Sequence, residues 1–305
     1  MNMTDPIYHD DEAARAHLES QRWPHGPYCP HCGEAEAIAK LEGAAAAKGL
    51  YNCRSCRTKF SVTVGTVFES SHIGLAKWLL AFRLMASSKK GISAVQLRRM
   101  LWGEHKGSYK TAWYLCHRIR SAMASAEKAK LTGIVEMDET YVGGKRRGSW
   151  GVRGRGADKE IVVGIKQRGG ELRFFHASDV KSGTLAKYIK ENVSDEVDVI
   201  MTDDFISYPN AITRAGHSRE KHKTIQHSSG VYVDGDITTN GIESAFSLLK
   251  RGIIGSWHKV SVKHLPAYLE EMTFRFNRRG RADIFLDTLR HMVTADPLTF
   301  ERLTA

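Results

Sequence analysis

Residues 133–144, GIVEMDETYVGG, carry the pattern on which the fold prediction depends. Ile134 and Met137 belong to an apolar run that predicts a buried strand. This run leads directly into Asp138 and Glu139 and then into a glycine turn. Acids at the end of an apolar strand are unexpected in a chain whose formal net charge is +11, so they indicate a chemical role.

A second apolar run, VDVIMT at residues 197–202, also ends in acids, Asp203 and Asp204. Between the two runs, the sequence predicts a hairpin that turns at residues 169–170 and an amphipathic helix; after them comes a helix with Glu243 near its start. This order of strand, hairpin, helix, strand and helix resembles an RNase H-like fold. Adjacent parallel strands that end together would place Asp138 and Asp203 close in space.

Three carboxylates brought together repel one another unless a hard cation lies between them. Mg²⁺ prefers oxygen ligands, and it can activate an attacking oxygen and stabilise a leaving one at a phosphodiester. Each acid also has a structural alternative. Asp138 could pair with lysines, Asp203 could begin a turn, and Glu243 could complete a capping box with Asn240.

The whole chain of 305 residues has a hydrophobic fraction of 42% and a pI near 9.4. Its basic excess favours a polyanionic partner such as nucleic acid. The N-terminus is acidic and lacks the apolar core of a signal peptide. The best apolar run, WLLAFRLMA, is short and is broken by Arg83. We therefore expect a soluble, cytoplasmic protein with no membrane partner.

Four of the five cysteines form two C-x-x-C pairs with twenty residues between them: Cys29, Cys32, Cys53 and Cys56. In a reducing cytosol this spacing favours tetrahedral zinc over disulfides. Because protein thiolates would fill all four positions, the zinc is predicted to be structural. The alternatives are two disulfides or a redox pair, while Cys116 stands alone in a helical pattern and is predicted to be packed.

Residues 72–130 form a proline-free helical segment with twelve basic residues and two acids. Its pattern of helix, glycine-containing turn and helix resembles a helix-turn-helix reader of DNA. Lys110, Arg118 and Arg120 on the second helix are the predicted DNA contacts. The alternative is an ordinary helical hairpin with a basic solvent face.

The segment GGKRRGSWGVRGRG, residues 143–156, combines glycines with several basic residues and cannot pack a core. Lys145, Arg146 and Arg147 are predicted to contact phosphates from this loop. A solvated linker is the alternative.

Several motifs in order resemble one known family over roughly residues 25–280. CPHCG and YNCRSCRTKFSVTVGTVF resemble the zinc ribbon of bacterial insertion-sequence transposases of the ISXO-like group. EMDETYVGGK, TDDFISY and TNGIESAFSLLKRGIIGSWHK resemble the DDE-type domain of the same group. The resemblance implies that Asp138, Asp203 and Glu243 are a catalytic triad that holds Mg²⁺ or Mn²⁺. Asp204 remains the alternative to Asp203.

The resemblance further implies an enzyme that binds terminal inverted repeats, cleaves DNA and transfers the freed strand to target DNA. Lys250 and Arg251 would contact that double-stranded DNA, and a homodimer or larger multimer would pair two ends in the nucleoid. A catalytically inactive DNA-binding regulator and a nuclease that does not join strands are the alternatives. The predicted organisation is an N-terminal helix (1–26), a zinc ribbon (27–70), a helical DNA-binding segment (71–131), an RNase H-like domain (132–280) and a C-terminal tail (281–305).

Overall fold

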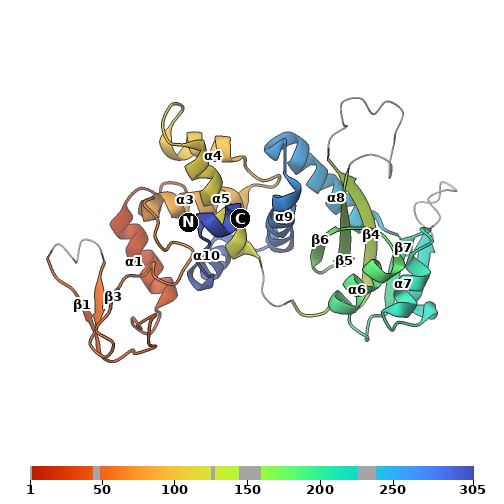
Figure 1. Ribbon diagram of the computed structural model, residues 1–305, viewed down its shortest axis with the longest axis horizontal. Coiled ribbons are helices and arrows are strands. Elements are labelled where there is room, and N and C mark those ends of the chain that lie inside the picture. The colour runs from red at the N-terminus through yellow and green to blue at the C-terminus, as the bar shows by residue number, and fades with distance from the viewer. Residues whose placement is uncertain (1, 44–48, 125–127, 144–158, 226–237) are drawn as a thin grey trace. The chain divides into compact units, whose positions relative to one another are not determined.

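The computed structural model of the chain describes every residue except 1, 44–48, 125–127, 144–158 and 226–237 (Figure 1). The chain folds into two compact units. The first combines Met1–Met123 with Arg281–Ala305, and the second is Ala124–Gly280. The chain therefore leaves the first unit, builds the second, and returns.

The first unit begins with a capped helix and a small ribbon. Helix α1 (Asp11–Arg22) starts at Asp10, whose carboxylate accepts hydrogen bonds from two first-turn amides. The ribbon is an antiparallel sheet of three strands in the order β1 (Ile38–Lys40), β2 (Tyr51–Cys53) and β3 (Lys59–Phe60). Trp23, at the end of α1, packs edge-on against Tyr51 and Phe60 and so joins the helix to the ribbon.

Helices complete the first unit: α3 (Leu75–Ser87), α4 (Ala94–Trp102), α5 (Tyr109–Met123), α10 (Ile284–Thr294) and α11 (Phe300–Thr304). Trp78 and Phe82 of α3 are fully buried and pack edge-to-face against Phe68. Residues 281–305, which the sequence predicted as a separate tail, are packed here. Helix α10 contacts α1, α3 and α5, and the Tyr114 hydroxyl of α5 donates to the Leu298 carbonyl.

The second unit contains a mixed five-stranded sheet: β4 (Ile134–Val142), β5 (Glu160–Gln167), β6 (Leu172–Ala177), β7 (Val199–Asp203) and β8 (His222–Ile225). The strand order is β6-β5-β4-β7-β8. The first three strands form an antiparallel meander, and β7 and β8 add parallel to β4. This topology is that of an RNase H-like domain, as the order of predicted elements indicated.

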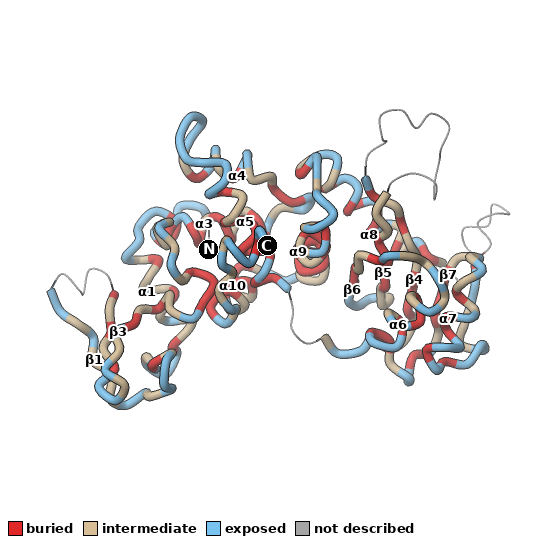
Figure 2. Tube along the Cα trace, in the orientation of Figure 1, coloured by how far each residue is buried: buried red, intermediate tan, exposed pale blue. Residues whose placement is uncertain are grey.

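Helices cover both faces of this sheet. Helices α6 (Ser182–Asn192) and α7 (Tyr208–Arg214) pack on a core that includes Val135 and Met137 of β4. Helices α8 (Asn240–Gly252) and α9 (Leu265–Arg278) pack on the opposite core, built on β5 and β6. In Figure 2 the strands β4 and β5 are largely buried between these layers. The sheet is therefore a rigid platform for side chains at its edges.

Short helical turns link these elements: 3₁₀ turns at Pro6–Tyr8, Arg219–Lys221 and Val262–His264, and a π-helix at Ile253–Trp257. Within the described parts of the chain, no helix combines the length and apolar character that a membrane span requires.

Candidate functional site

Asp138 lies in the middle of β4, where its register with β5 places it opposite Gly164. The prediction that both acid-tipped strands end at their acids is therefore wrong for β4. The apolar run stops at Met137, but pairing with β5 continues the strand to Val142. Pairing, rather than hydrophobicity, determines where this strand ends.

Asp203 is the last residue of β7, on the strand beside Asp138. In the parallel register of the two strands, Glu136 lies opposite Met201, and the two aspartates each lie two residues farther along. The backbone N–H of Phe205 donates to Asp203 Oδ1 at 3.1 Å. Asp204, by contrast, is exposed. The sheet therefore places Asp203, rather than Asp204, beside Asp138.

Glu139 joins these two aspartates, although the sequence did not single it out as a ligand. Within the described residues, one carboxylate oxygen from each of Asp138, Glu139 and Asp203 lies within 4.8 Å of the others. Glu139 Oε2 accepts a 2.7 Å hydrogen bond from the hydroxyl of Tyr208, which is fully buried in α7. The sequence signals were the adjacency of Glu139 to Asp138 and the position of Tyr208 shortly after Asp203.

Glu243 approaches the cluster from the first turn of α8. The N-cap of this helix is Thr239, whose hydroxyl donates to Glu243 Oε1 at 3.0 Å. A capping box based on Asn240 is therefore wrong, since Asn240 is already helical. Glu243 lies outside the group of oxygens within 4.8 Å, but its charge contributes to raising the pKa of Asp138.

The acids crowd one another. Burial, and then the charges of Asp203 and Glu139, raise the pKa of Asp138 to about 8. The backbone N–H of Glu139, which donates to Asp138 Oδ1 at 2.7 Å, opposes this shift. A divalent cation between the carboxylates would stabilise their charged forms. The oxygen donors suit Mg²⁺ or Mn²⁺ better than softer metals.

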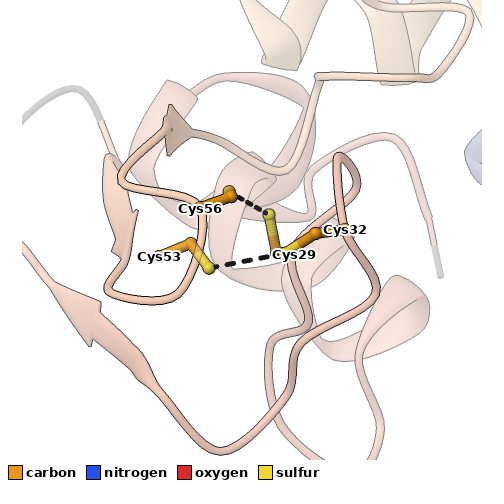
Figure 3. A group of neighbouring side chains, drawn as sticks. All are labelled: Cys29, Cys32, Cys53 and Cys56. Carbon is orange, nitrogen blue, oxygen red and sulfur yellow. Dashed lines mark hydrogen bonds between the residues drawn. The ribbon is translucent and has the colours of Figure 1, made fainter.

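The four cysteines of the ribbon meet at one point (Figure 3). The Sγ atoms of Cys29 and Cys56 are 3.6 Å apart, and those of Cys32 and Cys53 are 3.7 Å apart. A disulfide requires about 2.05 Å, whereas tetrahedral zinc with Zn–S bonds of about 2.3 Å requires sulfurs roughly 3.8 Å apart. The cluster therefore fits zinc, and a ring of four thiolates leaves no position for a substrate.

The two C-x-x-C turns share two backbone features. The N–H of Cys29 donates to the Glu34 carbonyl at 2.7 Å, and the N–H of Cys53 donates to the Thr58 carbonyl at 3.1 Å. The residue after each second cysteine has a positive φ, 78° at Gly33 and 59° at Arg57. Each turn thus directs two thiolates inward from one short segment.

The predicted DNA contacts of α5 divide into exposed and buried residues. Lys110, in the first turn, is exposed. Arg118 and Arg120 are only 4% and 1% exposed. An Arg118 Nη donates to the Glu69 carbonyl, and its guanidinium stacks on the Trp78 ring. Because other elements of the unit cover this half of α5, its basic residues do not mark a solvent face.

Lys250 and Arg251 are exposed on α8. Lys250 lies seven residues after Glu243, on nearly the same helix face. It lines a hollow of about 290 Å³ together with Tyr141 and Lys259. The predicted phosphate contacts Lys145, Arg146 and Arg147 fall outside the described residues.

Comparison with known proteins supplies matches to both units. The ISXO2-like transposase domain matches residues 130–277, and the transposase zinc-ribbon domain matches residues 9–59. A protein of Halobacterium salinarum (strain ATCC 700922 / JCM 11081 / NRC-1), described as an uncharacterized protein in transposable element ISH50, is 31% identical over 289 residues. The matched region covers 88% of this chain and 93% of that protein.

Proposed function

Because the chain belongs to the ISXO2-like transposases with an N-terminal zinc ribbon, we propose that it cleaves DNA at the terminal inverted repeats of its element and joins the freed ends to target DNA. The observation that carries this proposal is the pair Asp138 and Asp203, side by side on parallel strands of an RNase H-like sheet. Glu243 is the proposed third member of the triad.

The proposed reaction has two steps. A water molecule attacks a phosphodiester at the element end, and the P–O3′ bond breaks to leave a 3′-hydroxyl. That hydroxyl then attacks a phosphodiester of the target, forming one P–O bond and releasing a 3′-hydroxyl on the target strand. Bound Mg²⁺ or Mn²⁺ would supply charge that stabilises the attacking and leaving oxygens.

The chain's own residues have distinct proposed tasks. Asp138, Asp203 and Glu243 hold the cation, and the neighbouring Glu139 adds a fourth carboxylate. The hydroxyl of Tyr208 keeps Glu139 oriented toward the aspartates. This arrangement is preorganised because both strands are part of the buried sheet.

The proposed end recognition lies in the first unit. A helix-turn-helix reads bases with the N-terminal residues of its second helix. In α5 these residues, Tyr109, Lys110 and Thr111, are exposed, as is the turn before them (Figure 2). We therefore assign base reading to this turn, with Lys110 retained as a contact. Arg118 and Arg120 are assigned to the core.

Lys250 and Arg251 are the proposed phosphate contacts near the cut, because they lie exposed on the helix that carries Glu243. The net charge of +11 supports binding to both end and target DNA. Pairing of two ends requires at least two copies of the chain, so we propose a dimer or larger assembly on nucleoid DNA.

The test is cleavage of a duplex that carries the repeats flanking the gene, with Mg²⁺, by the wild type and by Asp138→Asn. We expect the wild type to nick at the repeat boundary and to join the product to a plasmid. The variant should bind the duplex equally well and cut neither strand. Equal binding with no cleavage by either protein, in Mg²⁺ or Mn²⁺, would instead support a DNA-binding regulator. Cleavage without joining would indicate a nuclease.

A further inference from the structure

A buried acid, Glu136, lies two residues before Asp138 on the same face of β4. Its side chain is 2% exposed. Oε2 accepts a hydrogen bond of 2.9 Å from the backbone N–H of Ile242, in the first turn of α8. Oε1 lies 3.3 Å from both Nε and Nη2 of Arg168. Glu136 therefore links β4 to the start of the helix that carries Glu243.

The start of α8 is shaped around this carboxylate. First-turn amides of a helix have no partner within the helix, and they form its positive end, so a carboxylate there is stabilising. Arg168 Nη2 also donates to the Thr238 carbonyl at 3.3 Å, which ties the segment before α8 to the same ion pair. A Cβ on Gly241 would lie 2.5 Å from Glu136 Oε2 and 2.8 Å from the Nζ of Lys166, which is paired with Glu136 across β4 and β5. The close approach of α8 to these side chains therefore favours glycine.

This contact constrains the spacing of the proposed triad. Glu136 and Asp138 are about 6.6 Å apart along one rigid strand, and Ile242 precedes Glu243 directly in α8. We propose that Glu136, with Arg168 as its counter-charge, is a positioning residue that holds Glu243 at the correct distance from Asp138 for shared metal binding. This inference depends on the proposed function of the acidic site.

The Glu136 carboxylate is buried, while the Arg168 side chain is 32% exposed. A buried charge is a poor choice if stability alone is required, because apolar residues of similar volume often serve as well or better. The Ile242 N–H is shared between Glu136 Oε2 and the Thr239 carbonyl, which lies 3.1 Å away. An apolar side chain at position 136 would leave only the contact within the first turn of α8 and would remove the one that joins this turn to β4. The ion pair is therefore better explained by the placement of α8 than by core stability.

Two variants disturb the contact between Glu136 and the start of α8 in different ways. Glu136→Gln keeps the size of the side chain and removes its charge, while Gly241→Ala inserts a methyl group against the carboxylate. The matched control is Gly183→Ala. Gly183 is also the second residue of a helix, α6, but a Cβ there comes no closer than 3.7 Å to another atom, Arg214 Nη1.

Three measurements are made on the full chain: Mn²⁺ affinity by calorimetry, cleavage of the repeat duplex, and hydrogen exchange of residues 238–246. Loss of a partner that orients metal ligands typically costs about 10–100-fold. We expect both variants to bind Mn²⁺ and to cleave more weakly by this factor, with faster exchange at the start of α8. Duplex binding without Mn²⁺ should stay unchanged, and Gly183→Ala should match the wild type throughout.

A double variant, Glu136→Met with Arg168→Met, separates positioning from stability. We expect it to regain much of the melting temperature lost in Glu136→Gln, with Mn²⁺ affinity and cleavage still low. Recovery of affinity and cleavage together with the melting temperature would overturn the proposal, as would wild-type behaviour of Glu136→Gln and Gly241→Ala. Failure of the wild type itself to bind Mn²⁺ or cut DNA would refute the proposed function instead.

Discussion

The two candidate metal centres of this protein are built in opposite ways. The cysteines of the ribbon lie between residues 29 and 56 and come from two short turns that share a backbone hydrogen bond and a positive φ. The acids lie between residues 138 and 243: Asp138, Glu139 and Asp203 meet because β4 pairs with β7, and Glu243 approaches them from α8. One site is therefore encoded in local spacing, and the other in the register of a sheet.

The two centres also differ in what supports them. The ribbon strands are two or three residues long, and among the described residues Tyr51 and Phe60 stack their rings beside them. The acids are mounted on a sheet with a hydrophobic core on each face. We therefore expect the ribbon to depend on its metal for folding and the acidic site to fold without one.

The largest expected effect is the loss of zinc from the ribbon. Cys53→Ser should release the metal and unfold the ribbon, because closed four-thiolate sites contribute directly to folding. Metal analysis should find about one zinc per wild-type chain and far less in the variant. Proteolysis should then cut within residues 27–60, while the second unit stays resistant.

Cys116→Ala is the control, since this buried cysteine lies in α5 and outside the cluster. It should keep its zinc. Retention of zinc and protease resistance by Cys53→Ser would contradict the closed-site interpretation.

The acidic site should show the reverse behaviour, a large loss of activity with the fold retained. Asp203→Asn should lower cleavage by about 10³-fold or more, because it removes a proposed ligand of the cation, whose positive charge would be worth several kcal/mol at the reacting phosphate. Asp204→Asn, one residue farther along and exposed, should change cleavage less than about threefold. Equal losses in the two variants, measured as single-turnover rates, would show that the strand register does not select the ligand.

Variants of Glu139 and Glu243 test how much each of these acids contributes to the acidic site. Glu243→Gln should abolish cleavage, because Glu243 is the proposed third member of the triad.

Glu139→Gln should weaken Mn²⁺ affinity by about 10–100-fold, since Glu139 stands within 4.8 Å of both aspartates. Tyr208→Phe should produce a smaller change in the same direction, because it removes only the hydrogen bond to Glu139. A larger loss of affinity in Glu243→Gln than in Glu139→Gln would show that Glu243 contributes more to metal binding than Glu139 does.

What the sequence could predict follows the same division. C-x-x-C spacing alone gave the four thiolates, because each turn fixes its own geometry. The order of strands and helices gave the RNase H-like fold and the pairing of Asp138 with Asp203. These inferences used local patterns or chain order, which a single sequence contains.

What the sequence missed depends on distant partners. Glu136 meets the Ile242 amide 106 residues away, and no local pattern marks that contact. Strand β8 is four residues long with two exposed positions, so its pairing with β7, and not its composition, makes it a strand. Arg118 and Arg120 were predicted to contact DNA from a basic helix, but packing around α5 covers them.

A smaller effect concerns pH. The pKa of Asp138 is about 8 in the folded chain and about 3.8 when it is exposed. The folded state therefore holds a proton that the unfolded chain releases, and stability should fall as pH rises from about 4 to 8. Without Mg²⁺, Asp138→Asn should lack this fall and should have a higher melting temperature than the wild type at pH 8.

This comparison requires buffers without added divalent ions and without a chelator that would remove zinc. At pH 5 the difference between the two proteins should shrink, because both side chains are then neutral. Added Mg²⁺ should raise the melting temperature of the wild type at pH 8 and not that of the variant. A constant difference across pH 5–8 would show that Asp138 does not titrate in this range.

The smallest effect lies inside the ribbon, where its two similar turns carry different residues at the same position. Gly33 and Arg57 both have positive φ, and glycine adopts this conformation without the cost of about 1–2 kcal/mol that other residues bear. A Cβ on Gly33 would meet no atom within 4 Å, so Gly33→Ala tests the backbone alone.

Because folding of the ribbon is linked to zinc binding, the zinc affinity measured in competition with a chelator reports these backbone energies. Gly33→Ala should weaken zinc affinity by about 5–30-fold, and Arg57→Gly should strengthen it by a smaller factor, about 2–5-fold, since glycine also loses more entropy on folding. Weaker zinc binding by Arg57→Gly would show that the arginine side chain, and not its backbone conformation, is what the second turn requires.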